Sequence, residues 1–158
     1  MGMNARHRPL VYFDANPLMY AFESRPELSD PIRPLIQALR AKPGAAVTSE
    51  LVLAELLAPI KRPGAKPQNI RRRIYFDLLI WSRIFDLRPI TRDILIETAD
   101  LRRFIKLKLP DAIHMVTAIQ AGCTFFLSND DDTCRTPEGL RHVKPDAEGV
   151  QMILGQIS

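Results

Sequence analysis

Four acidic residues, Asp14, Glu55, Asp111 and Asp130, stand beside or within strongly apolar segments of the chain. Carboxylate oxygens are the ligands that Mg²⁺ and Mn²⁺ prefer, whereas a zinc site normally contains cysteine or histidine at ligand spacing. Paired ions of this kind can activate water and stabilise the leaving oxygen during phosphodiester cleavage. The residue types therefore predict a magnesium or manganese site suited to phosphodiester hydrolysis.

The surroundings of these acids suggest how each is held. Glu55 is the one charged residue within the apolar segment 51–57, so we expect it to face inward, where an ionised carboxylate needs a cation or a raised pKa. A surface glutamate between two apolar stripes is the alternative. Asp111 follows Pro110 and is expected at a helix start, as an N-cap that also directs an oxygen to a metal. His114 is expected to be a hydrogen-bonded packing residue, with metal ligation as the alternative.

Strands are predicted wherever short apolar runs end in polar turns. Leu10–Phe13 and Thr124–Leu127 are such runs, and both are expected to be buried on both faces of a sheet. Asp14 and Asp130 follow them. Ligands bind beyond the carboxyl ends of the strands in open parallel sheets, so the two aspartates would meet at one edge if these strands are neighbours. Bonding to nearby turn amides is the ordinary role of a single aspartate at either position.

Helices are predicted from capping residues and from apolar spacings of three and four. Asn16 is expected to cap a short helix that begins at Pro17, and Thr91 a later one that ends before Pro110. The other helices are expected at residues 30–41, 50–58, 70–85 and 111–121, with short strands at 45–47 and 85–87. The tail is expected to add an edge strand near Val143 and a short helix near Met152.

This alternation predicts an α/β fold, a three-layer α/β/α sandwich with a mostly parallel central sheet. The length of 158 residues and the 46% hydrophobic content suit a single domain over residues 1–158. No apolar run approaches the roughly 18 to 20 residues of a membrane helix, and the basic segment Met1–Pro9 lacks a hydrophobic signal core. A cytoplasmic protein is therefore expected, with Cys123 and Cys134 as reduced thiols.

Basic residues are concentrated in the segment 56–76, which contains no acid. The chain has a net charge of +4, and the remainder is at −2 once the six bases of this segment are subtracted. We interpret the segment as a phosphate-binding surface for a polyanion; a solvated loop and helix face is the alternative. Its six bases are Lys61, Arg62, Lys66, Arg71, Arg72 and Arg73. The arginines are expected off an apolar stripe formed by Ile70, Ile74, Leu78, Trp81 and Phe85.

The order of these motifs resembles that of the PIN-domain ribonucleases, and especially the VapC-type toxins of bacterial toxin-antitoxin pairs. The resemblance extends from Val11 to Asp130. It rests on the segments Val11–Asn16, Thr48–Glu55, Leu109–His114 and Phe126–Asp130.

The resemblance implies metal-dependent endonucleolytic cleavage of RNA with Mg²⁺ or Mn²⁺, a Rossmann-like sheet, frequent homodimers and, for toxins, a partner antitoxin. The four acids would be the catalytic and metal-binding residues, and the six basic residues of segment 56–76 would bind the RNA. Asn16 and Ser128 would support them, although many members have threonine in place of Ser128. Asp131 and Asp132 extend the acidic run, and we include Asp132 among the supporting residues.

Two alternatives stand beside this hypothesis. A magnesium-dependent phosphatase of the haloacid-dehalogenase type also has a nucleophilic aspartate after its first strand, but it needs a second aspartate two residues later. This chain has Asn16 there, and asparagine cannot transfer the proton. The other alternative is a PIN module that binds RNA or protein and has lost its chemistry, which the presence of all four acids disfavours.

Overall fold

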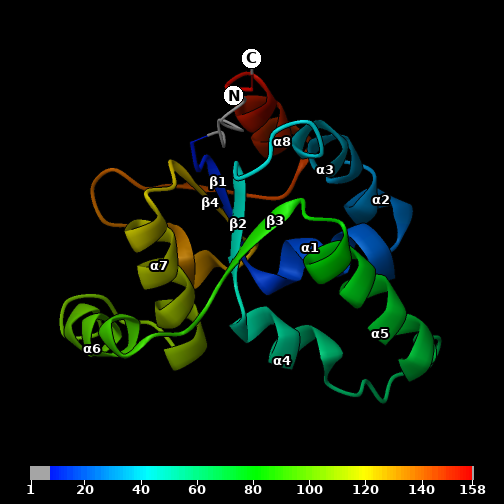
Figure 1. The fold of residues 1–158 in the computed structure, drawn as a ribbon, viewed down its shortest axis with the longest axis horizontal. Helices are drawn as coiled ribbons and strands as arrows, with labels where there is room; N and C mark the ends of the chain where they lie inside the picture. Colours follow the sequence, from blue (N-terminus) through cyan, green and yellow to red (C-terminus); the bar gives the residue numbers. More distant parts are fainter. Residues whose placement is uncertain (1–7, 158) are drawn as a thin grey trace, which may run out of the picture.

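The apolar runs form the middle of a five-stranded sheet in the computed structural model, which describes residues 8–157. All neighbouring strands are parallel, in the order β3-β2-β1-β4-β5 (Figure 1). The strands are β1 (Val11–Phe13), β2 (Ala46–Ser49), β3 (Phe85–Arg88), β4 (Phe125–Leu127) and β5 (Arg141–Val143). The three central strands are buried throughout, as expected for strands covered on both faces.

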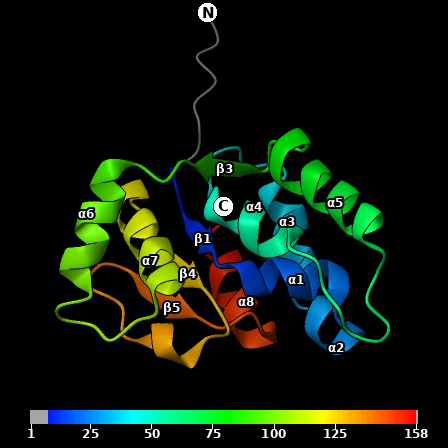
Figure 2. The ribbon, with the colours of Figure 1, turned by 90° about the horizontal axis from the view of Figure 1, so that it is seen from below.

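Helices cover both faces of this sheet, so the predicted α/β sandwich with a parallel sheet is confirmed. Helices α6 and α7 cover one face, and the remaining helices lie on the other (Figures 1 and 2). The helices are α1 (Ala15–Glu23), α2 (Pro26–Ser29), α3 (Arg33–Leu39), α4 (Leu51–Leu57), α5 (Gln68–Phe76), α6 (Arg92–Leu101), α7 (Leu109–Ala121) and α8 (Ala147–Leu154). A π-helical turn, η1 (Asp77–Trp81), follows α5, and a 3-10 turn, η2 (Asp131–Cys134), follows β4.

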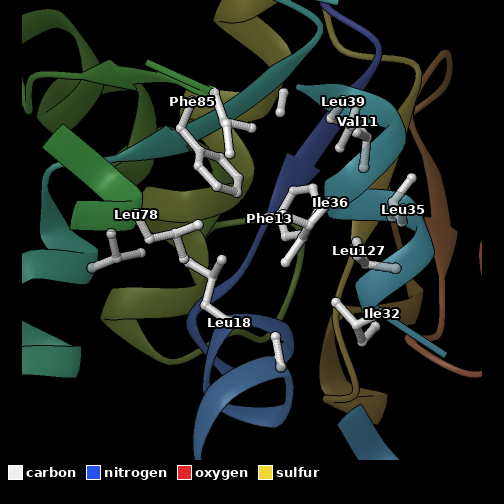
Figure 3. Close-up of a cluster of buried hydrophobic side chains, with 14 of the residues drawn as sticks. Val11, Phe13, Leu18, Ile32, Leu35, Ile36, Leu39, Leu78, Phe85 and Leu127 are labelled. Atoms are coloured by element: carbon white, nitrogen blue, oxygen red, sulfur yellow. The ribbon is translucent and has the colours of Figure 1, made fainter. Parts of the chain in front are cut away.

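Alternate residues of β1 enter two separate cores. Val11 and Phe13 belong to the larger core, where Phe13 meets Phe85 edge to face at 5.0 Å between ring centroids (Figure 3). Tyr12 points to the opposite face and stacks on Phe126 at 5.3 Å, above the buried residues of α7. The strand period of two thus puts Tyr12 on the side of the sheet where α7 lies.

Two predicted helix starts are wrong. The N-cap of α1 is Asp14, whose carboxylate accepts a hydrogen bond from the amide of Ala15, so the helix begins two residues before Pro17. Helix α7 begins at Leu109 with Pro110 in its first turn, which makes Asp111 a first-turn residue and not the N-cap. Proline suits such a position because its missing N–H has no partner within the helix there. The predicted cap of α6 by Thr91 is confirmed.

The predicted orientation of α5 is also wrong. Ile70 is 45% exposed and Trp81 71% exposed, while Arg71 and Tyr75 are fully buried. The face of α5 and η1 that packs on the core is therefore formed by Arg71, Tyr75, Leu78 and Leu79.

Arg71 is buried because it has polar partners from two other elements, α1 and the end of α4. Its guanidinium pairs with the buried carboxylate of Glu23 at the end of α1 and donates to the carbonyl oxygens of Leu56 at 2.7 Å and Ala58 at 2.8 Å. The hydroxyl of Tyr75 donates to the same Glu23 carboxylate. This network joins the end of α1 to α5 and to the end of α4.

The tail agrees with expectation, since β5 is an edge strand and α8 follows it. Within residues 8–157, no helix is both long enough and apolar enough to cross a bilayer. The basic segment Met1–Pro9 lies almost wholly outside the described residues. Cys123 is buried and Cys134 exposed, and both are free thiols.

Candidate active site

The carboxyl ends of β1 and β4 lie side by side, which brings two of the predicted acids to one edge of the sheet. Phe13 is in register with Leu127, and the amide of Asp14 donates to the carbonyl of Leu127 at 3.0 Å. The chain then continues through Ser128 to Asp130. The expected parallel pairing of these strands is confirmed.

Asp14 is the most firmly held of the four acids. It is 4% exposed, and its Oδ1 accepts from the amide of Ala15 at 2.8 Å. Its Oδ2 accepts from the hydroxyl of Ser128, also at 2.8 Å. The same hydroxyl oxygen accepts from the amide of Asp130 at 3.1 Å, so Ser128 joins the two acids through one atom.

The predicted supporting residues hold the loop after β4. The Oδ1 atom of Asn16 accepts from the amide of Asn129 at 3.0 Å, which fixes the loop to the start of α1. Asp132 donates its amide to Oδ1 of Asp130 at 2.9 Å, while its side chain is exposed. Asp131 forms an exposed ion pair with Lys144 at 2.9 Å.

Asp111 reaches the same edge from the first turn of α7. Burial, a hydrogen bond with Asp130 and the charges of Asp130 and Asp14 together raise the pKa of Asp111 to about 7, while His114 opposes the shift. A hydrogen bond between two carboxyl groups requires that one of them holds a proton. The close approach of Asp111 and Asp130 is thus an arrangement that a cation would stabilise.

Glu55 lies at the rim of this cluster and not in the core, contrary to the sequence expectation. Its side chain is 31% exposed, and its Oε1 lies 2.5 Å from Nε2 of His114. His114 is fully buried and hydrogen-bonded, as expected, and its Nε2 also lies 3.6 Å from Oδ1 of Asp14. One imidazole therefore lies between two of the four acids.

Tyr12 is the residue of this group that sequence analysis missed. Its hydroxyl oxygen lies 2.5 Å from Nδ1 of His114. Burial, followed by the charge of Asp14, raises the pKa of Tyr12 well above its usual value, so the hydroxyl keeps its proton. We assign Tyr12 as the donor to Nδ1, which leaves Nε2–H of His114 to donate to Glu55. The alternation of side chains along a strand could have identified Tyr12, because it places Tyr12 on the opposite face of the sheet from Val11 and Phe13, the face that α7 covers.

The donor set suits a hard divalent cation, although the side chains are not arranged as a finished coordination shell. Among residues 8–157, no group of three Asp, Glu, His or Cys side chains has the geometry of a metal site. In this arrangement Glu55 is hydrogen-bonded to His114, and Asp130 lies close enough to Asp111 to raise its pKa. All four acids offer oxygen ligands. Burial first, and then the neighbouring Asp130 and Asp14, raise the pKa of Asp111, and a cation would offset the negative charges of these neighbours.

Arg71 does not belong to the predicted basic surface. Arg71 is 1% exposed and paired with Glu23, so its assignment as an RNA-binding residue is wrong. A charged side chain in the interior needs its partners there and cannot also contact a phosphate outside. The other five, Lys61, Arg62, Lys66, Arg72 and Arg73, are exposed on α5 and on the loop before it.

These features define an α/β protein with an acidic site beyond the carboxyl ends of its central strands. The model of the PIN domain family matches residues 11–139, which include all four acids, and the chain belongs to this family. PIN domains are generally nucleases and generally use divalent metals. A search of curated proteins found no match to the chain.

Several solved structures have a similar fold. A chain of a toxin-antitoxin complex from Klebsiella pneumoniae is 28% identical, with a TM-score of 0.59 over 85% of this chain and 97% of that one. A chain of FitAB bound to IR36 DNA is 15% identical, with a TM-score of 0.63 over 86% and 95%. A chain of DNA-bound VapBC2 from Rickettsia felis is 15% identical, with a TM-score of 0.63 over 85% and 98%. At 15% identity, these last two show the shared fold alone.

Proposed function

We propose that this chain is a metal-dependent endoribonuclease and the toxin of a toxin-antitoxin pair, acting as one PIN-like domain on cytoplasmic RNA. The observation that carries the proposal is the meeting of acids from four different elements at one edge of the sheet. A chain that used these acids only as caps or surface charges would gain nothing from placing Asp111 against Asp130. The 28% identity to a chain of a toxin-antitoxin complex supports the toxin role, with a protein antitoxin as partner. Homodimer formation belongs to the same proposal.

Asp14, Asp111, Asp130 and Glu55 would hold Mg²⁺ or Mn²⁺. The chemistry that a bound ion supplies at such a site is activation of the attacking water and stabilisation of the leaving oxygen. The protein contributes orientation. Ser128 holds Asp14 beside the amide of Asp130, and Asn16 fixes the following loop, so two of the four acids are held in place before any substrate arrives.

The exposed bases offset the repulsion between this acidic site and a polyanion. Four carboxylates at one edge disfavour the approach of phosphates, whereas the loop after α4 presents Lys61, Arg62 and Lys66. Arg72 and Arg73 add two charges on α5. A backbone bound along these residues would pass α4, which carries Glu55.

The phosphatase alternative is weaker in the structure than in the sequence. Asn16 occupies the position of the required acid-base residue, and its side-chain oxygen already accepts from the amide of Asn129. It therefore holds a loop and cannot transfer protons. A direct comparison of substrates tests the choice: purified protein with Mg²⁺ or Mn²⁺ should cleave RNA and leave p-nitrophenyl phosphate intact. Rapid monoester turnover without RNA cleavage would contradict the proposal.

Replacing Arg72 and Arg73 together by glutamine should weaken RNA binding and reduce its salt dependence. If each arginine neutralises one phosphate, the slope of log affinity against log salt should soften by about 1.4, at roughly 0.7 per single-strand contact. The measurement is fluorescence anisotropy with labelled RNA in EDTA at several salt concentrations. Arg33→Gln, at the start of α3, with Arg40→Gln, at its C-cap, gives the same change in charge at exposed positions elsewhere. Equal slopes for the two double variants would show that Arg72 and Arg73 do not contact RNA phosphates and belong to a solvated helix face.

Replacing His114 by leucine should weaken Mn²⁺ binding by about 10- to 100-fold, the usual cost of losing a partner that orients a ligand. Glu55 would lose its donor at 2.5 Å, and its side chain, already 31% exposed, would then be free to turn to solvent. Calorimetric titration with Mn²⁺ measures the affinity.

Two variants separate this positioning role from simple loss of packing. His114→Gln keeps an N–H donor and should recover part of the affinity, whereas Tyr12→Phe removes only the hydroxyl and should give a smaller loss. The free energy of unfolding, measured in urea, shows whether each variant is folded. Mn²⁺ affinity equal to wild type in folded His114→Leu would exclude the role.

A further inference from the structure

A second basic segment lies between α6 and α7 and was not singled out by the sequence pattern. Residues 102–108 contain four basic residues and no acid. All four, Arg102, Arg103, Lys106 and Lys108, are exposed. Among the described residues none of them forms an ion pair with a carboxylate. Their charges are thus solvent-accessible and are not neutralised by a described carboxylate.

An exposed aromatic residue, Phe104, lies within this basic segment of the sequence. Phe104 is 83% exposed, more than any other large hydrophobic residue in the described part of the chain. Single exposed hydrophobic residues are common on protein surfaces. Phe104 differs because charged neighbours surround it in sequence, and the guanidinium of Arg103 lies over its ring at 5.8 Å from the centroid.

The turn that presents Phe104 is well anchored. The amides of Phe104 and Ile105 both donate to the carbonyl of Leu101 at 3.0 Å. Arg102 donates through Nε to the carbonyl of Leu107 at 3.2 Å, and the Leu107 side chain is buried. Arg102 thus holds the turn, and a partner would find the ring of Phe104 already displayed on a fixed backbone.

The segment lies beside the acidic site. Lys108 is the N-cap of α7, and Asp111 is in the first turn of that helix. The Cα atoms of Phe104 and Asp111 are at most about 19 Å apart, given four residues of chain and one helical turn. In Figures 1 and 2 the start of α7 lies on one side of the carboxyl ends of β1 and β4, and α4 and α5 lie on the other. The segment therefore leads into the α7 side of this edge of the sheet, opposite α4 and α5.

We propose that Phe104, Arg103, Lys106 and Lys108 form a binding surface for single-stranded RNA. An unpaired nucleobase stacks on Phe104, and the three basic side chains contact the flanking phosphates. The inference rests on the proposed nuclease function and names the form of RNA that this side of the site takes. An exposed aromatic ring among cations is the arrangement that binds single strands, whose bases are free to leave their neighbours. Duplex RNA keeps its bases paired and stacked, and offers Phe104 nothing to contact.

The composition favours nucleic acid over a protein partner. The centres of protein interfaces are depleted in charged residues, and in lysine especially. Here the aromatic ring is surrounded by arginine and lysine, with no acid nearer in sequence than Asp100 on one side and Asp111 on the other. The charge complements a phosphate backbone.

Replacing Phe104 by alanine should weaken binding of single-stranded RNA by about 5- to 150-fold and leave duplex affinity within twofold of wild type, since one base-aromatic stack is lost. Anisotropy with labelled RNA in EDTA measures binding without cleavage. Phe104→Tyr keeps an aromatic ring and should bind like wild type. Ile96→Ala removes a 55% exposed apolar side chain from α6 and should change neither affinity.

A spectroscopic readout tests the stacking contact itself. Trp81 is the single tryptophan of the chain, so Trp81→Phe with Phe104→Trp places one fluorophore in the turn. Its emission should be quenched by single-stranded RNA and unaffected by duplex RNA. Unchanged emission at saturating single-stranded RNA would overturn the stacking proposal.

The remaining outcomes separate this proposal from the one on which it rests. Wild-type protein that neither binds nor cleaves RNA would remove both. Wild-type protein that cleaves RNA, beside a Phe104→Ala variant with unaltered single-strand affinity, would overturn this proposal alone. A change in solution mass of Phe104→Ala with unaltered RNA affinity would make the turn a contact between protein copies and would also overturn it.

Discussion

Asp14→Asn should cleave RNA at least roughly 100-fold more slowly than the wild-type protein. Metal ions at such sites contribute several kcal/mol of charge stabilisation, and each 1.36 kcal/mol is about tenfold in rate. Asparagine has the shape of aspartate, but it lacks the charge and one of the two oxygens that Asp14 directs to Ala15 and Ser128. Single-turnover cleavage of an RNA cut by the wild type measures the effect.

A matched change of an exposed aspartate tests whether the loss belongs to the site. Asp30 lies at the end of α2, so Asp30→Asn should cleave at the wild-type rate. Urea unfolding of both variants checks that they remain folded. An Asp14→Asn protein that cleaves RNA as fast as Asp30→Asn would exclude Asp14 from the chemistry.

Arg71→Met should lower the free energy of unfolding by about 3 to 5 kcal/mol, the usual cost of removing one partner of a buried ion pair. Methionine fills much of the volume, but it leaves the Glu23 carboxylate without its cation and the carbonyls of Leu56 and Ala58 without their donor. The neighbouring Arg72 is exposed, and Arg72→Met should change stability by no more than about 0.5 kcal/mol. Urea denaturation compares the two.

A double variant identifies the cause of the loss. If the unpaired charge of Glu23 is responsible, Arg71→Met combined with Glu23→Leu should recover part of the stability, because both ends of the pair are then apolar. Equal stability of Arg71→Met and Arg72→Met would contradict the buried network. RNA affinity gives a second test. Because Arg71 lies in the interior and is not expected to contact phosphate, folded Arg71→Met should bind RNA like the wild-type protein.

The sheet could be predicted because its information is local. Leu10–Phe13 and Thr124–Leu127 are continuous apolar runs, which suit strands buried on both faces, and a polar turn follows each one. The position of two acids at one edge then depended only on parallel pairing. The register of Phe13 with Leu127 supplies that pairing.

The environment of Arg71 could not be predicted because it depends on contacts that are distant in sequence. The apolar spacing of Ile70, Ile74 and Leu78 indicated one helix face, but the face that packs inward contains an arginine. A buried guanidinium is stable only with partners, and here they come from α1 and the end of α4. No spacing rule within α5 contains that information.

Glu55 and Asp111 were assigned to the correct elements with the wrong local detail. Apolar neighbours on both sides of Glu55 suggested burial, whereas its side chain lies at the rim and contacts His114. Asp111 was expected to cap α7, but the helix starts two residues earlier at Leu109. Helix ends and side-chain directions depend on tertiary partners, which propensity does not encode.

The most direct test of the central claim is cleavage of a mixed structured RNA pool by the purified protein with Mg²⁺ or Mn²⁺, beside an EDTA control and the Asp14→Asn variant. We expect internal cuts that require the metal and are lost in Asp14→Asn. Cuts that persist in EDTA, or that Asp14→Asn makes at the wild-type rate, would contradict a metal-dependent nuclease site built around Asp14.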